Sequence, residues 1–206
     1  MAAGKRRNFS NQRRMGTRRY KQLIVIACEG RVTEAEYFKM LNAQQFAVHF
    51  KCIPRDHKSS PGKVLRAMET YLKQNELRPG DEAWLVVDTD SWSEASLQQL
   101  WNWACKKENY GLAVSNPKFE FWLLLHFEPG HGASTASSIE QRLNKYSGVP
   151  GKHLEKSLYM EANIHKAIQR AKSKDHPPCK DWPRNAPGTT VYHLVERFPL
   201  RAETVS

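Results

Sequence analysis

The feature that most restricts the fold is an alternation of short apolar runs with amphipathic stretches between residues 23 and 127. The strand-like runs are 23–28 (LIVIAC), 46–53, 83–90 and 111–115, and helical spacing follows at about 33–41, 63–74, 93–108 and 119–127. Continuous apolar runs bounded by turn residues are typical of strands that are covered on both faces. We therefore predict an α/β fold with a roughly four-stranded parallel sheet flanked by helices.

Three regions can be distinguished along the 206 residues. Residues 1–22 form a basic arm, 23–127 contain the alternating core, and 128–206 form an extension of different character. The extension begins with a Gly- and Ser-rich connection, continues with helical stretches near 139–147 and 157–173, and ends with a helix or strand at 189–198. We expect a mainly helical C-terminal extension that completes the same domain, because the chain is short for two cores.

Composition excludes a membrane-spanning or secreted disulfide-rich protein. The sequence has no apolar stretch that approaches the ~20 residues of a membrane span. The four cysteines are scattered without CxxC spacing, and one of them lies in a predicted core strand. Asp175, His176 and Cys179 have no paired partner motif that would complete a zinc site. A reduced, cytoplasmic protein with no membrane contact is the expectation.

The formal charge of +11 is concentrated in the arm. Residues 1–22 contain no acid and eight cations: Lys5, Arg6, Arg7, Arg13, Arg14, Arg18, Arg19 and Lys21. Basic arms with little apolar content often bind the phosphates of nucleic acid. We predict nucleic-acid binding by Arg6, Arg7, Arg13, Arg14, Arg18 and Arg19, and the alternatives are a solubilising tail or one that binds an acidic partner.

Acidic side chains follow two of the predicted strands. Glu29 ends the first strand on a turn at Gly30, and Asp88 and Asp90 end the third. In an open α/β sheet, ligands bind beyond the carboxyl ends of the strands. If these two strands are neighbours, the three carboxylates meet in one crevice, and Glu34 at the start of the first helix can join them. Gly30 is expected to let the backbone turn sharply there.

Carboxylates this close together raise one another's pKa and destabilise the fold unless a cation neutralises them. Oxygen-only ligands suit Mg²⁺ or Mn²⁺, which keep open positions for substrate phosphate oxygens. A single Glu-Gly turn or a single DxD motif is common by chance. Both together, at corresponding strand ends, favour a metal site.

The arrangement resembles the Toprim domain, whose signature is a Glu after the first strand and a DxD after the third. The segments ACEGRVTEAEYF, WLVVDTD, SNPKFEFWLLLHF and NAPGTTVYHLVERF, in this order, resemble the RloB family of bacterial proteins. That resemblance implies a Toprim-like catalytic domain, a place in phage-defence or restriction-associated loci, and an ABC-type ATPase or other defence protein as partner. Related Toprim effectors are metal-dependent nucleases, some of which act on tRNA.

The resemblance also implies roles for individual residues. Glu29 would be the Toprim glutamate, and Asp88 and Asp90 the metal pair. Glu34, or Thr33 beside it, would serve a second metal. Two-metal phosphodiester cleavage activates water at one ion and stabilises the leaving oxygen at the other. A lysine that assists the transition state would be Lys118 or Lys152.

Two further features of the core have more than one interpretation from the sequence. Asn116 and Glu120 follow the fourth strand, so they either face the crevice and orient water or substrate, or Asn116 caps the next helix while Glu120 meets a surface lysine. Trp92, Trp101 and Trp103 crowd the third helix, where packing is the commoner role and base stacking the alternative.

We therefore expect a nuclease that uses Mg²⁺ or Mn²⁺ on RNA or DNA. The alternative from another class is a non-catalytic nucleic-acid- or partner-binding module on a Toprim scaffold. The sequence has no GxxxxGK[ST] loop with which to time its own activity, so control by a partner is expected. Residues 128–188 are the expected surface for an ATPase, a second copy of the chain or a structured RNA.

Overall fold

The structure is a computed structural model that describes residues 22–30, 32–44, 48–52, 61–90, 92–147 and 154–197. The strands are β1 (Gln22–Cys28), β2 (Val48–Cys52), β3 (Glu82–Asp88), β4 (Tyr110–Asn116) and β5 (Gly188–Thr189). The helices are α1 (Thr33–Gln44), α2 (Pro61–Gln74), α3 (Glu94–Ala104), α4 (Glu120–Leu124), α5 (Ala136–Ser147), α6 (Glu161–Lys174) and α7 (Val191–Val195), with a 3₁₀ turn at Lys156–Leu158.

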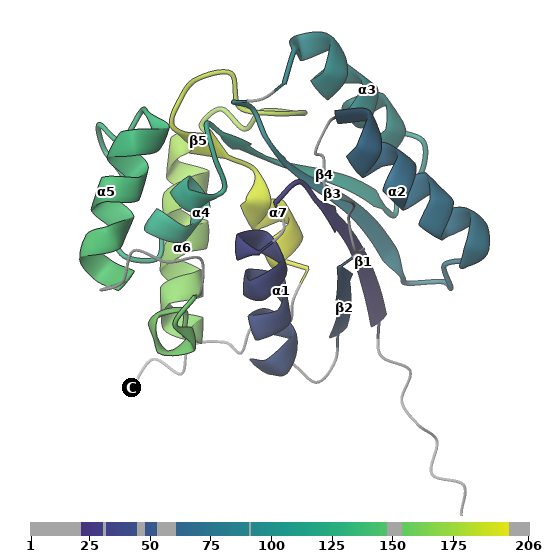
Figure 1. Ribbon diagram of the computed structural model, residues 1–206, viewed down its shortest axis with the longest axis horizontal. Coiled ribbons are helices and arrows are strands. Elements are labelled where there is room, and N and C mark those ends of the chain that lie inside the picture. Colours follow the sequence, from purple (N-terminus) through teal and green to yellow (C-terminus); the bar gives the residue numbers. More distant parts are fainter. Residues whose placement is uncertain are drawn as a thin grey trace, which may run out of the picture.

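The described strands form one sheet in the order β2-β1-β3-β4-β5 (Figure 1). The strands β1 to β4 run parallel, as the alternating pattern predicts, and β5 pairs antiparallel with β4. The sequence pattern does not predict this fifth strand as such. It comes from the extension, so residues beyond 127 complete the sheet of the core.

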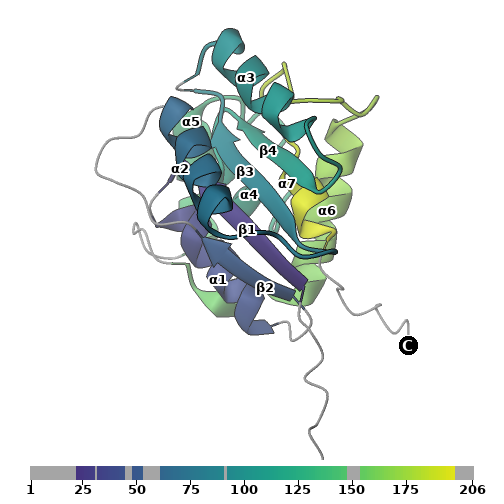
Figure 2. The same cartoon turned by 90° about the vertical axis from the view of Figure 1, so that its right-hand side faces the viewer.

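Side chains alternate between the two faces of the sheet, and each face is covered by helices. Ile24, Ile26 and Cys28 pack in the cluster that includes α1 and α4 to α7, whereas Val25 and Ala27 pack in the cluster with α2 and α3. Figure 2 looks onto the α2 and α3 side, and Figure 1 shows the three layers edge-on. Burial on both faces explains why the strands read as continuous apolar runs.

The order of the strands creates a crevice between β1 and β3. The chain passes from β1 to its neighbour β2 through α1 on one face, then crosses to the other side of β1 through α2 on the opposite face. Such a reversal of strand order is a topological switch point, and ligands in open α/β sheets bind there at the carboxyl ends of the strands. Glu29 and Asp88 lie at these two strand ends.

Most predicted boundaries agree with the structure, and two segments differ. The third helix is confirmed with its Ser93 cap, whose Oγ accepts from Ser96 N at 3.3 Å. The helix expected over 119–127 is only five residues long in α4, after which the chain turns. The closing segment, expected as helix or strand, contains both β5 and α7.

Within the described part of the chain, the helices are all too short or too polar to cross a membrane. The four cysteines are all free, with Cys28 buried in β1 as predicted.

Candidate active site

Glu29 lies directly between the ends of the two neighbouring strands. Its backbone N donates to Val86 O at 2.9 Å, which continues the pairing of β1 with β3 by one residue. The Glu29 carboxylate Oε2 accepts from Asp88 N at 3.3 Å and from Trp92 Nε1 at 2.5 Å. The side chain expected at the crevice is therefore held there by the backbone of the third strand and by an indole.

Trp92 is a site residue for which the sequence indicates only packing or base stacking. The turn after β3 positions it, because Trp92 N donates to Thr89 O at 3.2 Å and Thr89 N donates to Ser115 O at 2.9 Å. Three tryptophans lie close together in this part of the sequence, so the residue that reaches Glu29 could be found only from the geometry of the turn.

The main structural role of Gly30 is to leave space for the Glu34 side chain, and its role in the turn is secondary. Glu34 is almost fully buried, at 4% exposure, and its Oε1 accepts from Gly30 N at 2.8 Å. A Cβ atom on Gly30 would lie 1.8 Å from Glu34 Oε2. Gly30 is not among the glycines with positive φ, so the expected sharp turn is not its main reason. The glycine makes room for a carboxylate. Thr33, the alternative to Glu34 in the sequence analysis, is the first residue of α1.

Asp88 is the most perturbed carboxyl of this group. Its Oδ1 is buried and has no hydrogen-bond partner within the described residues. Burial, followed by the charges of Glu34, Glu120, Glu29 and Asp90, raises its pKa well above the usual value. The sequence prediction that acids from separate segments meet at this edge therefore agrees with the geometry, and the protein itself leaves one buried oxygen unsatisfied.

Glu120, the first residue of α4, belongs to the same cluster. Burial raises its pKa, and the charges of Glu140 and Asp90 add to the effect, whereas Lys118 opposes it. Burial also raises the pKa of Glu34, with a contribution from the charge of Glu120. Of the two interpretations left open by the sequence, the structure favours the one in which Glu120 faces the crevice.

Lys118 contributes a positive charge at the rim of the cluster. Its Nζ lies 3.9 Å from Asp90 Oδ2 and 3.5 Å from Glu140 Oε1. Partial burial alone would lower the pKa of Lys118, but the carboxylates of Glu140, Asp90 and Glu120 raise it overall. The ammonium group therefore stays charged beside Asp90.

Asn116 has a different role from either one expected. Its Nδ2 donates to Pro183 O at 3.0 Å and to Arg184 O at 3.3 Å, so it anchors the loop that leads into β5. The N-cap of α4 is Phe119, which makes no side-chain cap bond. The prediction of a helix cap is wrong because the chain takes one further turn at Pro117 and Lys118 before α4 begins.

Comparison with known proteins gives one match. Residues 24–198 match the family described as RloB-like protein. The chain belongs to this family. Neither curated proteins nor solved structures gave a match. The matched range of this RloB-like chain includes all the described strands from Ile24 onward and every acidic residue of the cluster.

Other predicted site residues of the RloB-like chain lie outside the described residues. These are Lys152 and the arm residues Arg6, Arg7, Arg13, Arg14, Arg18 and Arg19.

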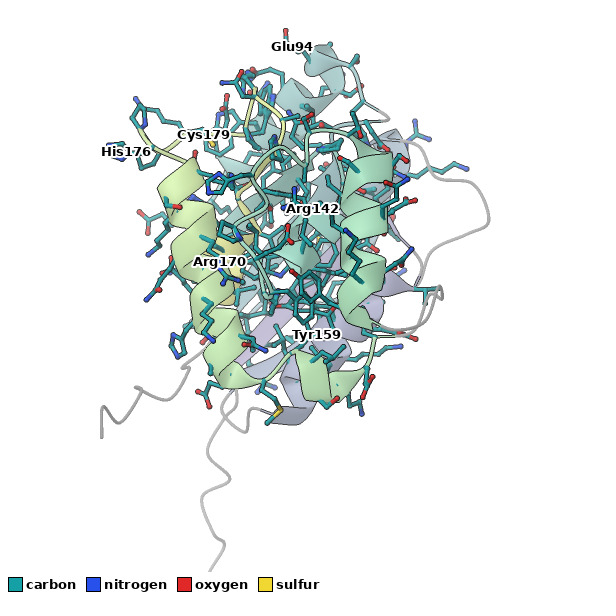
Figure 3. All side chains as sticks on the ribbon, turned by 90° about the vertical axis from the view of Figure 1, so that its left-hand side faces the viewer. Glu94, Arg142, Tyr159, Arg170, His176 and Cys179 are labelled. Carbon is teal, nitrogen blue, oxygen red and sulfur yellow. The ribbon has the colours of Figure 1, made fainter. Side chains whose placement is uncertain are left out.

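The Asp175 to Cys179 segment is described, and the Asp175 side chain stabilises this loop. Its Oδ1 accepts from Cys179 N at 2.9 Å, and its Oδ2 accepts from Tyr192 OH at 2.8 Å. Figure 3 shows His176 at the outer tip of that loop.

The acidic cluster has the donor atoms that a divalent cation requires. Among the residues that the structure describes, no three His, Cys, Asp or Glu side chains stand together in a metal-binding arrangement. The donor set nonetheless consists only of carboxylate oxygens, which are the ligands of Mg²⁺ and Mn²⁺, and it includes the unpartnered Asp88 Oδ1. The chemistry of these residues fits such an ion, with Glu29, Glu34, Asp88 and Asp90 as the side chains that would hold it.

Proposed function

We propose that this RloB-like chain is a metal-dependent nuclease with a Toprim-like site, which hydrolyses phosphodiester bonds in RNA, such as tRNA, or in DNA. The observation that carries the proposal is Asp88 Oδ1, a buried and unpartnered carboxylate oxygen among four further acidic side chains. A cation is the natural partner of such an oxygen, because burying uncompensated charge is costly. Bound there, Mg²⁺ or Mn²⁺ would supply Lewis-acid chemistry to a phosphodiester oxygen.

The residues around the cluster are suited to different tasks in this reaction. Trp92 and the backbone of Asp88 fix the orientation of the Glu29 carboxylate. Burial raises the pKa values of Glu34 and Glu120 in the chain without a cation, so a divalent ion that binds there would compete with their protons. Lys118 keeps a positive charge at the rim, where a phosphate would enter.

We further propose that the activity serves bacterial anti-phage defence and that a partner ATPase controls it. The support is membership of the RloB-like family together with the absence of a nucleotide-phosphate loop of the GxxxxGK[ST] type from the sequence. The isolated chain should then be weakly active or silent.

The test uses Asp88→Asn and Asp90→Asn variants, with Glu108→Gln in the exposed turn between α3 and β4 as the matched control. Each protein is assayed on tRNA, other RNA and DNA with Mn²⁺, alone and with a candidate partner ATPase, and cation binding is measured by calorimetry. We expect both aspartate variants to lose cleavage and cation binding while their unfolding midpoints stay at or above that of the wild type. Cleavage by both variants at the wild-type rate would refute the site. If the wild type itself binds no cation through its carboxylates, the result would favour a non-catalytic binding module.

A further inference from the structure

The helices α5 and α6 both border the face of the molecule that Figure 3 shows, and basic side chains of both lie on it. Arg142 lies on the α5 side of this face and Arg170 on the α6 side. Lys166 and Lys174 come one turn before and one turn after Arg170, so these three cations form a stripe along α6. Lys145 follows Arg142 by one turn of α5 and is exposed. The α5–α6 surface consists of these cations and one aromatic residue: Arg142, Lys145, Tyr146, Lys166, Arg170 and Lys174.

Cations from the two helices lie close enough to influence one another. Burial lowers the pKa of Lys174, and the charge of Arg142 lowers it further. Lys174 makes no ion pair with any residue that the structure describes. Arg170 donates through Nη1 to Leu125 O at 2.7 Å, and a backbone carbonyl does not neutralise its charge. A bound anion would offset this repulsion, so the surface favours a ligand with negative charge.

Glu128 is a carboxylate that contacts the α5–α6 surface. It pairs with Nη2 of Arg142, and its Oε2 accepts from Tyr146 OH at 2.9 Å. This carboxylate therefore orients an arginine and a tyrosine of the surface, and it offsets the charge of one of the five cations.

The other acidic side chains of α5 and α6 are directed to other parts of the molecule. Glu140 of α5 lies 3.5 Å from Lys118 Nζ, at the rim of the acidic cluster. Glu161 begins α6, about two and a half turns before the central arginine of the stripe, which places it on the opposite side of that helix. Asp175, after the last turn of α6, accepts from Tyr192 OH at 2.8 Å. The two helices and Glu128 therefore leave the α5–α6 surface with an excess of positive charge.

Tyr146 adds an exposed aromatic ring to this surface. The ring stacks on Phe127, with 4.9 Å between the ring centroids and 8° between the planes, and Phe127 packs in turn against Tyr159. Tyr146 is nevertheless 40% exposed, so a further ring can stack on the side away from Phe127. An aromatic ring beside cations is the combination by which proteins bind single-stranded nucleic acid without sequence preference.

We propose that the α5–α6 surface binds a single-stranded segment of RNA or DNA, with phosphates on the cations and one base stacked on Tyr146. The bases of a duplex stack on one another, so an unpaired strand is the ligand that can use the ring. Around α5, Arg142 and Glu140 are about 200° apart, so the surface and the acidic cluster lie on opposite sides of this helix, about 10 Å from each other. A strand held here can place a neighbouring phosphate at the cluster, and the inference rests on the proposed function in naming that strand as the substrate.

The test measures how much the bases of a strand contribute to binding. The probe is a fluorescein-labelled thymidine strand of about ten nucleotides, within the usual site sizes of proteins that bind single strands. Its reference is an abasic strand of the same length and charge. Binding to the full chain is followed by fluorescence anisotropy in EDTA, so neither cleavage nor a divalent cation contributes. The basic arm meets the same phosphates in both strands, so the ratio of the two affinities reports the bases.

We expect the wild type to bind the thymidine strand about tenfold more tightly than the abasic strand, the contribution of one stacked base. Tyr146→Ser should lose most of this preference. Tyr146→Phe keeps the ring on Phe127 and removes only the hydroxyl, so it should retain the preference. Unfolding midpoints of the two variants check that both are folded.

The cations are tested by the dependence of affinity on salt. Lys174→Gln should reduce the slope of log affinity against log salt by about 0.7, which corresponds to one phosphate contact of a single strand. Lys73→Gln is the matched control, because it removes the same charge from the last turn of α2 on the other face of the sheet. Its slope should stay at the wild-type value.

Four results would overturn the proposal. Equal binding of the thymidine and abasic strands by the wild type would exclude a stacked base, and a preference that survives in Tyr146→Ser would place the base elsewhere. Equal slopes for Lys174→Gln and Lys73→Gln would remove the cations from the binding surface. If a polyglutamate peptide displaces the labelled strand as well as unlabelled thymidine strand does, the ligand is an acidic protein segment instead. Cleavage plays no part in these measurements, so failure of this inference is distinct from failure of the nuclease proposal.

Discussion

At the scale of single residues, the site depends on side chains that hold other side chains in place. Trp92 donates to the Glu29 carboxylate at 2.5 Å, and Gly30 leaves the space that Glu34 fills. Neither Trp92 nor Gly30 would contribute a side-chain oxygen to a cation. Groups that orient the ligands of a metal are commonly as important for affinity as the ligands. Replacing either of these two supporting residues should therefore disturb the site.

Replacing Trp92 with Phe keeps the aromatic ring and removes the indole N–H. The Glu29 carboxylate then loses its bond from the indole, so we expect affinity for Mn²⁺ to fall roughly tenfold, as for other residues that orient ligands. Calorimetry measures the affinity, and Trp101→Phe on α3 is the control because Trp101 lines a cavity at the start of β4, at the other end of that strand from the carboxylates. Equal losses in the two variants would show that the effect is not specific to Glu29.

Replacing Gly30 with Ala puts a methyl group where the Glu34 carboxylate lies. The end of the Glu34 side chain must swing away and lose its bond from Gly30 N, which should lower the free energy of unfolding by about 1 kcal/mol, the contribution of one hydrogen bond. Urea denaturation measures the change. Gly62→Ala in α2 is the matched control, because a Cβ there meets nothing within 4 Å and alanine favours the helix. If Gly30→Ala is as stable as the wild type, the close approach does not constrain the site.

At the scale of elements, the strands and most helices could be predicted because their signals are local and periodic. The pairing of β1 with β3, on which the site depends, is only a condition at the level of the sequence, because the alternating pattern does not determine which strands are neighbours. The strand β5 could not be predicted, because Gly188 and Thr189 carry no apolar run and are a strand only through their pairing with β4. Likewise, the hydrogen bonds of Asn116 to the carbonyls of Pro183 and Arg184 could not be predicted, because nothing in the sequence around Asn116 indicates these distant partners.

The segment after α4 also contains a buried histidine. His126 is fully enclosed among aromatic rings; its Nδ1 donates to Trp122 O at 3.1 Å and its Nε2 accepts from Tyr37 OH at 3.2 Å. Burial lowers the pKa of His126 to about 3. The ring is therefore neutral in the folded chain and titrates near its ordinary pKa in the unfolded chain.

A lowered pKa in the folded state means that the unfolded chain binds the extra proton. The contribution of His126 to stability should then be complete above about pH 7.5 and decline as the pH falls toward 3, by about 2 kcal/mol between pH 7.5 and 5. Urea denaturation across this range measures the slope. His126→Gln should flatten it, whereas the exposed His131→Gln should keep it. A wild-type slope in His126→Gln would assign the pH dependence to other groups.

At the scale of the whole molecule, the charges of the chain are unevenly distributed. Eight of its cations lie in residues 1–22, while the candidate site gathers carboxylates that repel phosphate. An electrostatic field that draws nucleic acid toward the chain must therefore come from elsewhere than the site, and the arm is its largest source.

Deleting residues 1–20 removes seven of these charges and leaves Gln22 to begin β1. The slope of log affinity for tRNA or duplex DNA against log salt should become shallower, by about 0.9 for each duplex phosphate that the arm no longer neutralises. Fluorescence anisotropy across a salt series measures it. An unchanged slope would mean that the arm faces a protein partner or none.

The strand that completes the sheet also sets the moment at which a growing chain can finish folding. Residues 188 and 189 pair with the end of β4, Thr190 bonds to Val114, and the loop before them anchors Asn116. A ribosome must therefore translate at least as far as residue 190 before this corner can close. A product released earlier, by a stalled ribosome or a premature stop codon, carries the acidic residues without the strand that braces them, so such a fragment should not assemble the candidate site.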